Sequence, residues 1–143
     1  MNVPDEVDGQ GEDIALSNEL LAPVVGEPLV QFRMGYAIHL ELGHQFDVTI
    51  ETPLTVVDGG NRWSGEPLTA DAAGALLPLN LREVTLVRVD RDGTLNLGLG
   101  EATLNVPSHP MYEAWQVRGP RGMLIVCPPG GEYVAVWRPE DES

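Results

Sequence analysis

The residues that could carry chemistry are few and scattered along the chain. Ser108 and His109 are neighbours in a proline-flanked segment, which sets them side by side without making the nucleophile–base pair that acyl transfer needs. His39 and Glu41 share one face of an expected strand, but no HExxH or comparable spacing completes a metal site. No serine lies in a G-x-S-x-G nucleophile elbow. The sequence therefore predicts no catalytic residue, no metal site and no cofactor.

The single cysteine, Cys127, ends the apolar run Met-Leu-Ile-Val-Cys and alternates in phase with Met123 and Ile125. A reactive thiol is typically exposed in electropositive surroundings, whereas this pattern predicts a buried, inert one. One cysteine also excludes an internal disulfide and Cys-based zinc ribbons.

All eight basic residues are arginine, and the formal net charge is −14. The absence of lysine excludes Schiff-base and P-loop lysine chemistry. Residues 1–27 hold seven acidic residues and no base, and residues 140–142 add three, so residues 28–139 have 12 acids against the eight arginines. Phosphate backbones repel such a chain, and we expect no nucleic-acid binding.

Alternating apolar residues predict a mainly β fold of antiparallel hairpins and meanders, with an α+β arrangement still open. The expected strands are residues 29–34, 37–42, 46–51, 54–57, 83–89, 95–99, 103–106, 112–118, 123–127 and 133–137. One short helix is expected near residues 69–77, with Thr69 as N-cap, Asp71 in the first turn and Pro78 as the stop.

A weak internal repeat relates two expected hairpins. The segment Ile38-His-Leu-Glu-Leu-Gly43 parallels Leu95-Asn-Leu-Gly-Leu-Gly100, and another apolar strand that ends before a proline follows each. Chance alternation remains open as the explanation. The alternative is two related β units with the helix between them.

The length of 143 residues fits one domain. We expect an acidic, partly disordered N-terminal segment at residues 1–27, a single β-rich domain at 28–138, and an acidic tail at 139–143. The first residues are acidic where a secretory signal would be basic, and no apolar stretch is long enough to cross a membrane. We expect a soluble protein of the cytoplasm without a membrane partner.

Aromatic residues gather late in the chain. Tyr112 and Trp115 have opposite parity, so a regular strand buries one and presents the other. We predict a partner-binding surface formed by Tyr112, Glu113, Trp115 and Trp137, because Tyr and Trp are enriched among interface anchors. The alternative is that Trp115 belongs to the core.

The segment from Pro110 to Trp137 resembles the end of a small bacterial domain family of unknown function. The shared pattern is Tyr-Glu-Ala-Trp at 112–115, Gly-Pro-x-Gly at 119–122, and Pro-Gly-Gly-Glu at 129–132 before a strand that ends in Trp. The resemblance covers about residues 30 to 138 and brings no known reaction. By analogy it implies an immunity-type or accessory protein.

Three classes of function follow. We favour a protein-binding domain that is not an enzyme and engages another protein. The candidate partners are a basic protein and a second copy of the chain in a homodimer. A small-molecule-binding β domain is the alternative, and a small hydrolase that uses paired carboxylates is the least favoured.

Overall fold

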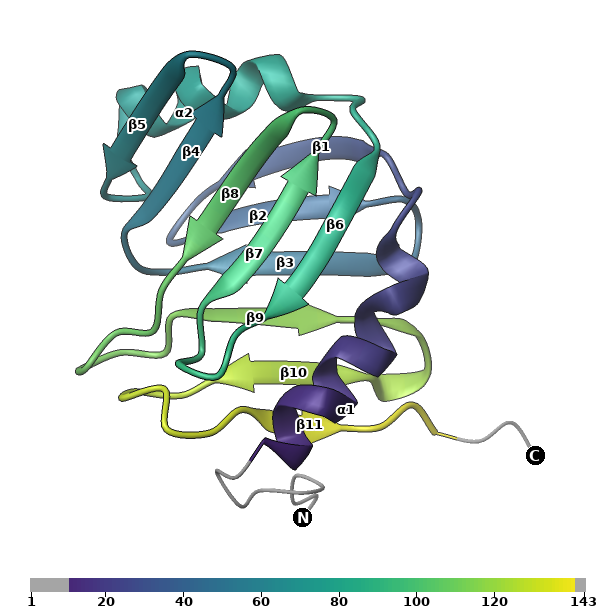
Figure 1. The fold of residues 1–143 in the computed structure, drawn as a ribbon. Helices are drawn as coiled ribbons and strands as arrows, with labels where there is room; N and C mark the ends of the chain where they lie inside the picture. Colours follow the sequence, from purple (N-terminus) through teal and green to yellow (C-terminus); the bar gives the residue numbers. More distant parts are fainter. Residues whose placement is uncertain (1–10, 141–143) are drawn as a thin grey trace.

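The computed structural model describes residues 11–140, which form two antiparallel β-sheets packed face to face (Figure 1). The larger sheet contains, in spatial order, β1 (Leu29–Met34), β2 (Ile38–Leu42), β3 (Phe46–Ile50), β9 (Trp115–Arg118), β10 (Leu124–Cys127) and β11 (Ala135–Trp137). The smaller contains β5 (Asn61–Gly65), β4 (Leu54–Asp58), β8 (Ala102–Val106), β7 (Leu95–Leu99) and β6 (Val84–Val89). The predicted mainly β, antiparallel fold is confirmed.

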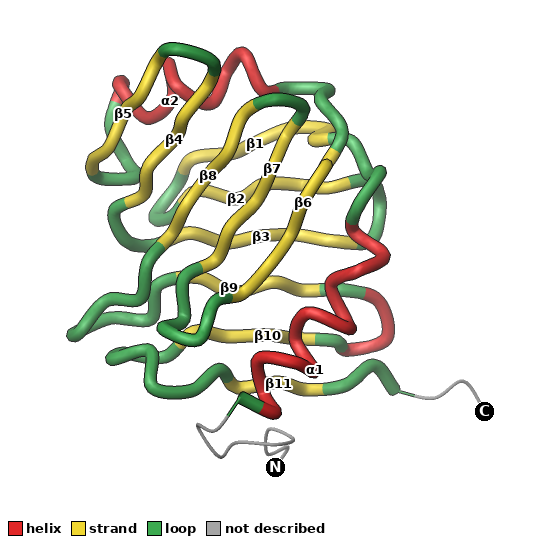
Figure 2. The backbone as a smooth tube through the Cα atoms, viewed as in Figure 1, coloured by secondary structure: helices red, strands yellow, loops and turns green. Residues whose placement is uncertain are grey.

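The core lies between the sheets, whose strands cross at a large angle (Figure 2). In β2, β3, β7, β8 and β9 apolar side chains recur at every second residue, and this alternation turns one face of each sheet inward. The strand β2 follows the pattern fully, with Ile38, Leu40 and Leu42 buried and the two polar residues between them half-buried. The largest fully buried side chains are Trp115, Leu21, Leu29, Ile38, Leu40, Leu42, Ile50, Leu54, Leu76, Leu79, Leu95 and Leu97.

The order of elements repeats. A first unit runs through the helix α1 (Glu12–Leu21), the 3-10 turn η1 (Ala22–Val24) and β1–β2–β3, and then crosses to the smaller sheet as β4 and β5. A second unit runs through α2 (Ala70–Leu76), η2 (Leu77–Leu79) and β6–β7–β8, and then crosses to the larger sheet as β9 and β10. The last strand, β11, has no counterpart in the first unit.

Backbone contacts repeat with the order of elements. Gly43 N–H donates to the Pro28 carbonyl (2.8 Å), and Gly100 N–H donates to that of Glu83 (2.9 Å). Both glycines adopt a left-handed φ, of 61° and 60°, which favours glycine. Pro28 and Glu83 also form an antiparallel bridge with each other. The bridge joins equivalent positions, so the two units are related by an approximate two-fold axis.

Around this axis, each unit donates a backbone hydrogen bond to the other unit at equivalent positions. Gly26 N–H donates to the Val84 carbonyl (2.8 Å), and Leu81 N–H donates to the Leu29 carbonyl (2.7 Å). Leu81 has a φ of 71°, which is uncommon for a residue with a side chain. It is the equivalent in the second unit of Gly26, whose φ is 96°. The repeat seen weakly in the sequence is thus a repeat of structure.

Helix α1 lies along one open end of the sandwich, against β6 and β11. The Asn18 carboxamide accepts from Val89 N–H (2.8 Å) and donates to the Val89 carbonyl (3.1 Å). The Asp13 carboxylate accepts from Val134 N–H (2.6 Å), just before β11. An edge strand presents unpaired N–H and C=O groups. The two side chains therefore satisfy backbone groups that a further strand would otherwise bind.

The sequence pattern did not predict α1. Its buried face carries Asp13 and Ser17 beside Leu16 and Leu21, so the apolar periodicity is interrupted. The Ser17 hydroxyl donates to the Asp13 carbonyl within the helix (2.8 Å). Part of the acidic segment 1–27 therefore packs on the β body, while residues 1–10 and 141–143 lie outside the described chain.

Helix α2 is where the sequence placed it. Thr69 Oγ1 accepts from Ala72 N–H (3.1 Å), Asp71 lies in the first turn, and η2 with Pro78 follows directly. The strand β5, by contrast, was not expected, because its sequence Asn-Arg-Trp-Ser-Gly lacks apolar alternation. No helix within residues 11–140 has both the length and the apolar character required to cross a membrane.

Candidate functional site

A loop at residues 107–114 joins β8 to β9 and carries the most exposed apolar side chains of the late aromatic region. Met111 is 71% exposed and Tyr112 is 65% exposed. The imidazole Nδ1 of His109 accepts from the N–H groups of Met111 (3.0 Å) and Tyr112 (3.3 Å). The rings of His109 and Tyr112 lie 5.0 Å apart. A local turn around His109 thus holds Met111 and Tyr112 at the tip of the loop.

Backbone hydrogen bonds join the loop at 107–114 to the end of β10 and to the segment that follows β10. Gly130 N–H donates to the His109 carbonyl (2.8 Å), and Ala114 N–H donates to the Cys127 carbonyl (3.1 Å). Gly131 packs so closely against Ser108 that a side chain at position 131 would clash with it. A rigid scaffold that presents an exposed loop is the usual arrangement of a binding site.

Acidic groups lie beside the tip. Glu113 follows Tyr112 and is half-buried. Burial is the main cause that raises the pKa of Glu113, the charge of Glu51 raises it further, and Arg118 opposes the shift. We call the surface of His109, Met111, Tyr112, Glu113 and Glu51 the tip surface. It combines two exposed apolar side chains with two carboxylates.

Trp115 does not belong to this surface. Its side chain is fully buried, with 0% exposure, and its indole N–H donates to the Gly93 carbonyl (2.9 Å). It ties the β6–β7 turn to the core of the sandwich. The alternative that Trp115 belongs to the core is confirmed, and from this position it cannot contact a partner.

Trp137 lies apart from Tyr112. It pairs with Leu124 on β10, whereas the loop at 107–114 leads into Trp115, which pairs with Cys127 at the other end of β10. Trp137 is half-buried on the outward face of the larger sheet. Of the four residues predicted to bind a partner, the structure brings together only Tyr112 and Glu113. The sequence analysis did not include Met111 and Glu51.

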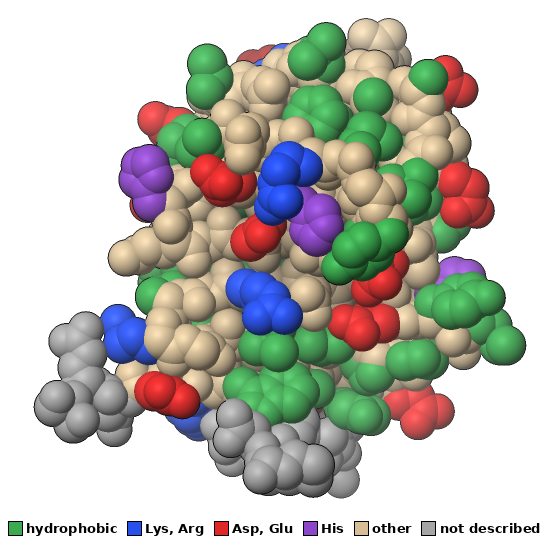
Figure 3. Space-filling view, turned by 180° about the vertical axis from the view of Figure 1, so that it is seen from behind, with side chains coloured by type: hydrophobic (Ala, Val, Ile, Leu, Met, Phe, Trp, Pro, Cys, Tyr) green, Lys and Arg blue, Asp and Glu red, His purple; other side chains and the backbone are tan. Residues whose placement is uncertain are grey.

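The outward face of the larger sheet carries charges of both signs in its middle (Figure 3). Arg33 lies 3.6 Å from the Asp47 carboxylate, and Arg118 stands opposite Asp47 on β9. Gln31 Nε2 donates to the Glu41 carboxylate (3.3 Å). Because these groups meet one another across the strands, this face does not form a field of one sign.

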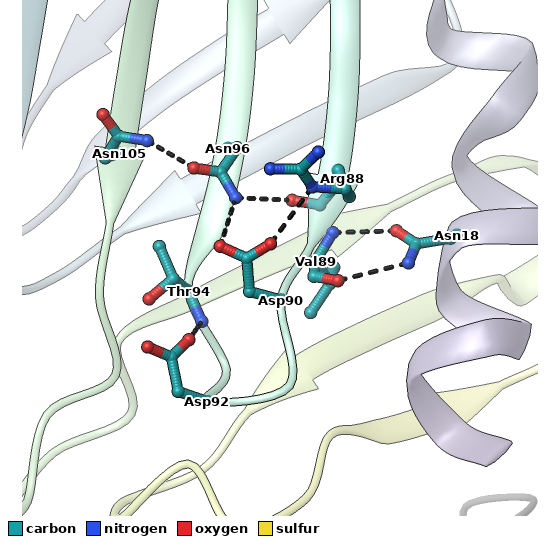
Figure 4. A network of polar contacts seen from close by, with 8 residues as sticks. All are labelled: Asn18, Arg88, Val89, Asp90, Asp92, Thr94, Asn96 and Asn105. Carbon is teal, nitrogen blue, oxygen red and sulfur yellow. Dashed lines mark hydrogen bonds and ion pairs between the residues drawn. The ribbon is translucent and has the colours of Figure 1, made fainter. Parts of the chain in front are cut away.

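The outward face of the smaller sheet carries a polar network (Figure 4). Arg88 Nε donates to Asp90 (3.1 Å), Asn96 Nδ2 donates to the same carboxylate (2.9 Å), and Asn105 donates to Asn96. Each member forms at least one hydrogen bond with another member of the network. The network therefore joins the strands β6, β7 and β8 and the turn that follows β6.

The structure shows the surroundings of two groups considered for chemistry, Cys127 and His39. Cys127 is buried as predicted, and burial, with smaller contributions from Asp92 and Glu113, raises the pKa of its thiol to about 12. The thiol is thus protonated at neutral pH. His39 Nδ1 lies 3.1 Å from Thr49 Oγ1. No group of three His, Cys, Asp or Glu side chains within residues 11–140 could hold a metal ion.

A cavity of about 320 Å³ lies between the β4–β5 hairpin and α2. Its lining includes Val56, Trp63, Asp71 and Ala75, with Asp58 and Arg62 near the turn. Both oxygens of Asp58 are engaged by the Arg82 guanidinium, at 3.0 and 3.1 Å. No pattern in the sequence predicted this cavity, because β5 was not expected.

The fold and the tip surface together define a two-sheet antiparallel β domain with a rigidly held apolar loop. The sequence model of a family described as a family of unknown function (DUF6188) matches residues 20–138, and the chain belongs to this family. The search of curated proteins found no match, and neither did the search of solved structures.

Proposed function

We propose that the domain binds another protein through the tip surface and does not act as an enzyme. The observation that carries the proposal is the pair Met111 and Tyr112, exposed by 71% and 65% at the tip of a fastened loop. A tyrosine buries a large, rigid area at small cost in side-chain entropy, and few such anchors supply most of the affinity of an interface.

Charge favours a basic partner. Glu113 follows Tyr112 and lies near Glu51, and the whole chain has a formal net charge of −14. Opposite charge steers association and raises the rate of encounter, whereas the desolvated centre sets most of the lifetime of the complex. We therefore expect basic residues around an apolar pocket on the partner.

The test is capture of proteins from a native lysate by the immobilised full chain and by two variants. Tyr112→Ala removes the proposed anchor. Tyr36→Ala is the matched control, because Tyr36 is also exposed, by 79%, but lies in the β1–β2 turn. We expect a captured protein that Tyr36→Ala retains and Tyr112→Ala loses. Equal capture by both variants argues against the tip surface.

The cavity beside Trp63 supports a second candidate function, the binding of a small molecule. Its volume of about 320 Å³ is at the lower end of ligand pockets. A metabolite that raises the melting temperature, together with no protein captured from lysate, favours this alternative.

An immunity-type or accessory role in the bacterial cytoplasm is part of the same proposal. Small domains of this kind act by occupying a larger partner, and a single buried thiol suits a reducing compartment.

A further inference from the structure

The strand β5 is an edge strand of the smaller sheet, whereas its equivalent in the second unit, β10, lies inside the larger sheet. Val56 pairs with Trp63 in the first unit as Val117 pairs with Ile125 in the second. In the larger sheet Ile125 also pairs, on its other side, with Val136 of β11. Within residues 11–140 no strand pairs with Trp63 on that side. The position that β11 fills beside β10 is therefore open beside β5 (Figure 1).

The cavity lies beside the residue that is equivalent to Ile125, at the edge where the second unit has a further buried side chain. Val136 is fully buried, with 0% exposure, beside the equally buried Ile125. Trp63, which is equivalent to Ile125, lines the cavity of about 320 Å³ between the hairpin and the helix. Its volume exceeds that of an aliphatic side chain such as valine, so one inward side chain of an added strand can enter it.

The helices α1 and α2 also differ in the size of the side chains that they place at equivalent positions. When α1 and α2 are aligned at the proline of the 3-10 turn that follows each, Leu16 corresponds to Asp71 and Leu20 to Ala75. Leu16 is buried and Leu20 packs against the core, whereas Asp71 is exposed and Ala75 is small. Helix α1 fills the space next to β11, and α2 leaves the corresponding space unfilled.

The free edge of β5 offers backbone groups for pairing. A two-residue turn joins Asp58 to Asn61, and in such hairpins these flanking residues form the hydrogen-bonded pair that closes the turn. Successive residues of an antiparallel strand turn their N–H and C=O groups to opposite sides. The backbone groups of Arg62 and Ser64 therefore point away from β4, and both residues are exposed.

We propose that β5 accepts an extended segment of another protein as a sixth strand of the smaller sheet. The segment pairs antiparallel with β5, as β11 does with β10, and places one aliphatic side chain in the cavity beside Trp63. Backbone hydrogen bonds supply affinity in this mode of recognition, and the cavity selects the side chain. This site is separate from the tip surface and goes beyond the proposed function.

A second copy of the chain fits the site less well. If two β5 strands paired, the apolar side chain available to fill the cavity would be Trp63. That side chain is half-buried and already packs against its own core. The occupant we commit to is an extended segment of a different protein, with an aliphatic residue that faces inward.

The probe is an acetylated and amidated peptide, YVAVWR, the sequence of residues 133–138 that fills the equivalent position. It is titrated against the full chain while hydrogen exchange of the backbone amides is followed. We expect slower exchange at Arg62 and Ser64, and loss of binding when the peptide backbone is N-methylated at alternate residues. Protection at β10, which would mean displacement of β11, contradicts the proposal, and so does no binding up to about 1 mM.

Ala75→Phe fills the cavity from α2 and should weaken peptide binding about tenfold or more. Ala70→Phe is the matched control, because Ala70 is on the same helix but outside this cavity, and it should change nothing. If Ala75→Phe fails to fold, Ser64→Pro removes an N–H from the free edge, where a strand tolerates proline. It should abolish binding.

Further readouts separate this site from the alternatives. Tyr112→Ala should bind the peptide like the unaltered chain, so the tip surface can fail without affecting this result. Protection of β5 that grows with protein concentration in the absence of peptide overturns the proposal in favour of a second copy. Equal binding by the N-methylated peptide overturns it in favour of a small-molecule pocket.

Discussion

At the scale of residues, two aromatic side chains close in sequence have opposite roles. Tyr112 and Trp115 are an odd number of residues apart, so a regular strand would bury one and expose the other. This spacing alone could not say which of the two is buried. The turn around His109 keeps Tyr112 out of the strand, and β9 begins only at Trp115. Trp115 is thus the core residue and Tyr112 the exposed one.

Trp115→Ala should therefore destabilise the protein by about 3–5 kcal/mol, because it leaves a cavity and an unpaired Gly93 carbonyl. Tyr112→Ala should change the stability by less than about 0.5 kcal/mol. Chemical denaturation of the two variants measures both effects. A stable Trp115→Ala protein would place this side chain outside the core.

The pKa of Glu113 gives a prediction with a definite sign. Because the pKa in the folded state is raised above the ordinary 4.5, the charged carboxylate destabilises the folded state above that folded pKa. The disadvantage disappears as the pH falls below the ordinary value. Glu113→Gln should raise the melting temperature at about pH 7 and leave it unchanged at about pH 3. An equal rise at both values would point to a cause other than charge.

At the scale of elements, the alternation of β2 and β7 and the cap and stop of α2 were enough to predict these elements. The helix α1 was hidden because two of its buried residues, Asp13 and Ser17, are polar and are satisfied by hydrogen bonds. The strand β5 was hidden because it is an edge strand with exposed Arg62 and Ser64. In both elements tertiary contacts, and not local pattern, decide the structure.

Asn18 tests the role of α1 at the sheet edge. Asn18→Ala removes both hydrogen bonds to Val89 and leaves its N–H and C=O without these partners. We expect a loss of about 1–3 kcal/mol of stability and faster amide exchange at Val89. Glu19→Ala, at an exposed position of the same helix, is the control and should change little. Unchanged amide exchange at Val89 would mean that the hydrogen bond from Val89 N–H to Asn18 does not protect the edge of β6.

At the scale of the whole molecule, two related units close one core. The candidate site could be predicted only in part from the sequence. Tyr112 and Glu113 were found because they are neighbours in the chain. Glu51 was missed because its proximity depends on the hydrogen bond from Glu51 N–H to the Ala114 carbonyl (3.0 Å), which only the fold creates.

If charge steers the partner, added salt should slow association and leave dissociation nearly unchanged, because screening acts over about 8 Å at physiological ionic strength. Stopped-flow measurements with the captured partner at several salt concentrations check this. A salt effect confined to dissociation would place the important carboxylates inside the contact.

The most direct test of the proposed function is a titration of the captured partner with Tyr112→Ala, run beside a thermal melt of the same variant. The exposed anchor predicts affinity weaker by about 2 kcal/mol, or roughly 30-fold, with an unchanged melting temperature. Tyr36→Ala should match the unaltered chain in both measurements. Unchanged affinity for Tyr112→Ala, or affinity lost together with stability, would contradict the claim that this loop binds the partner.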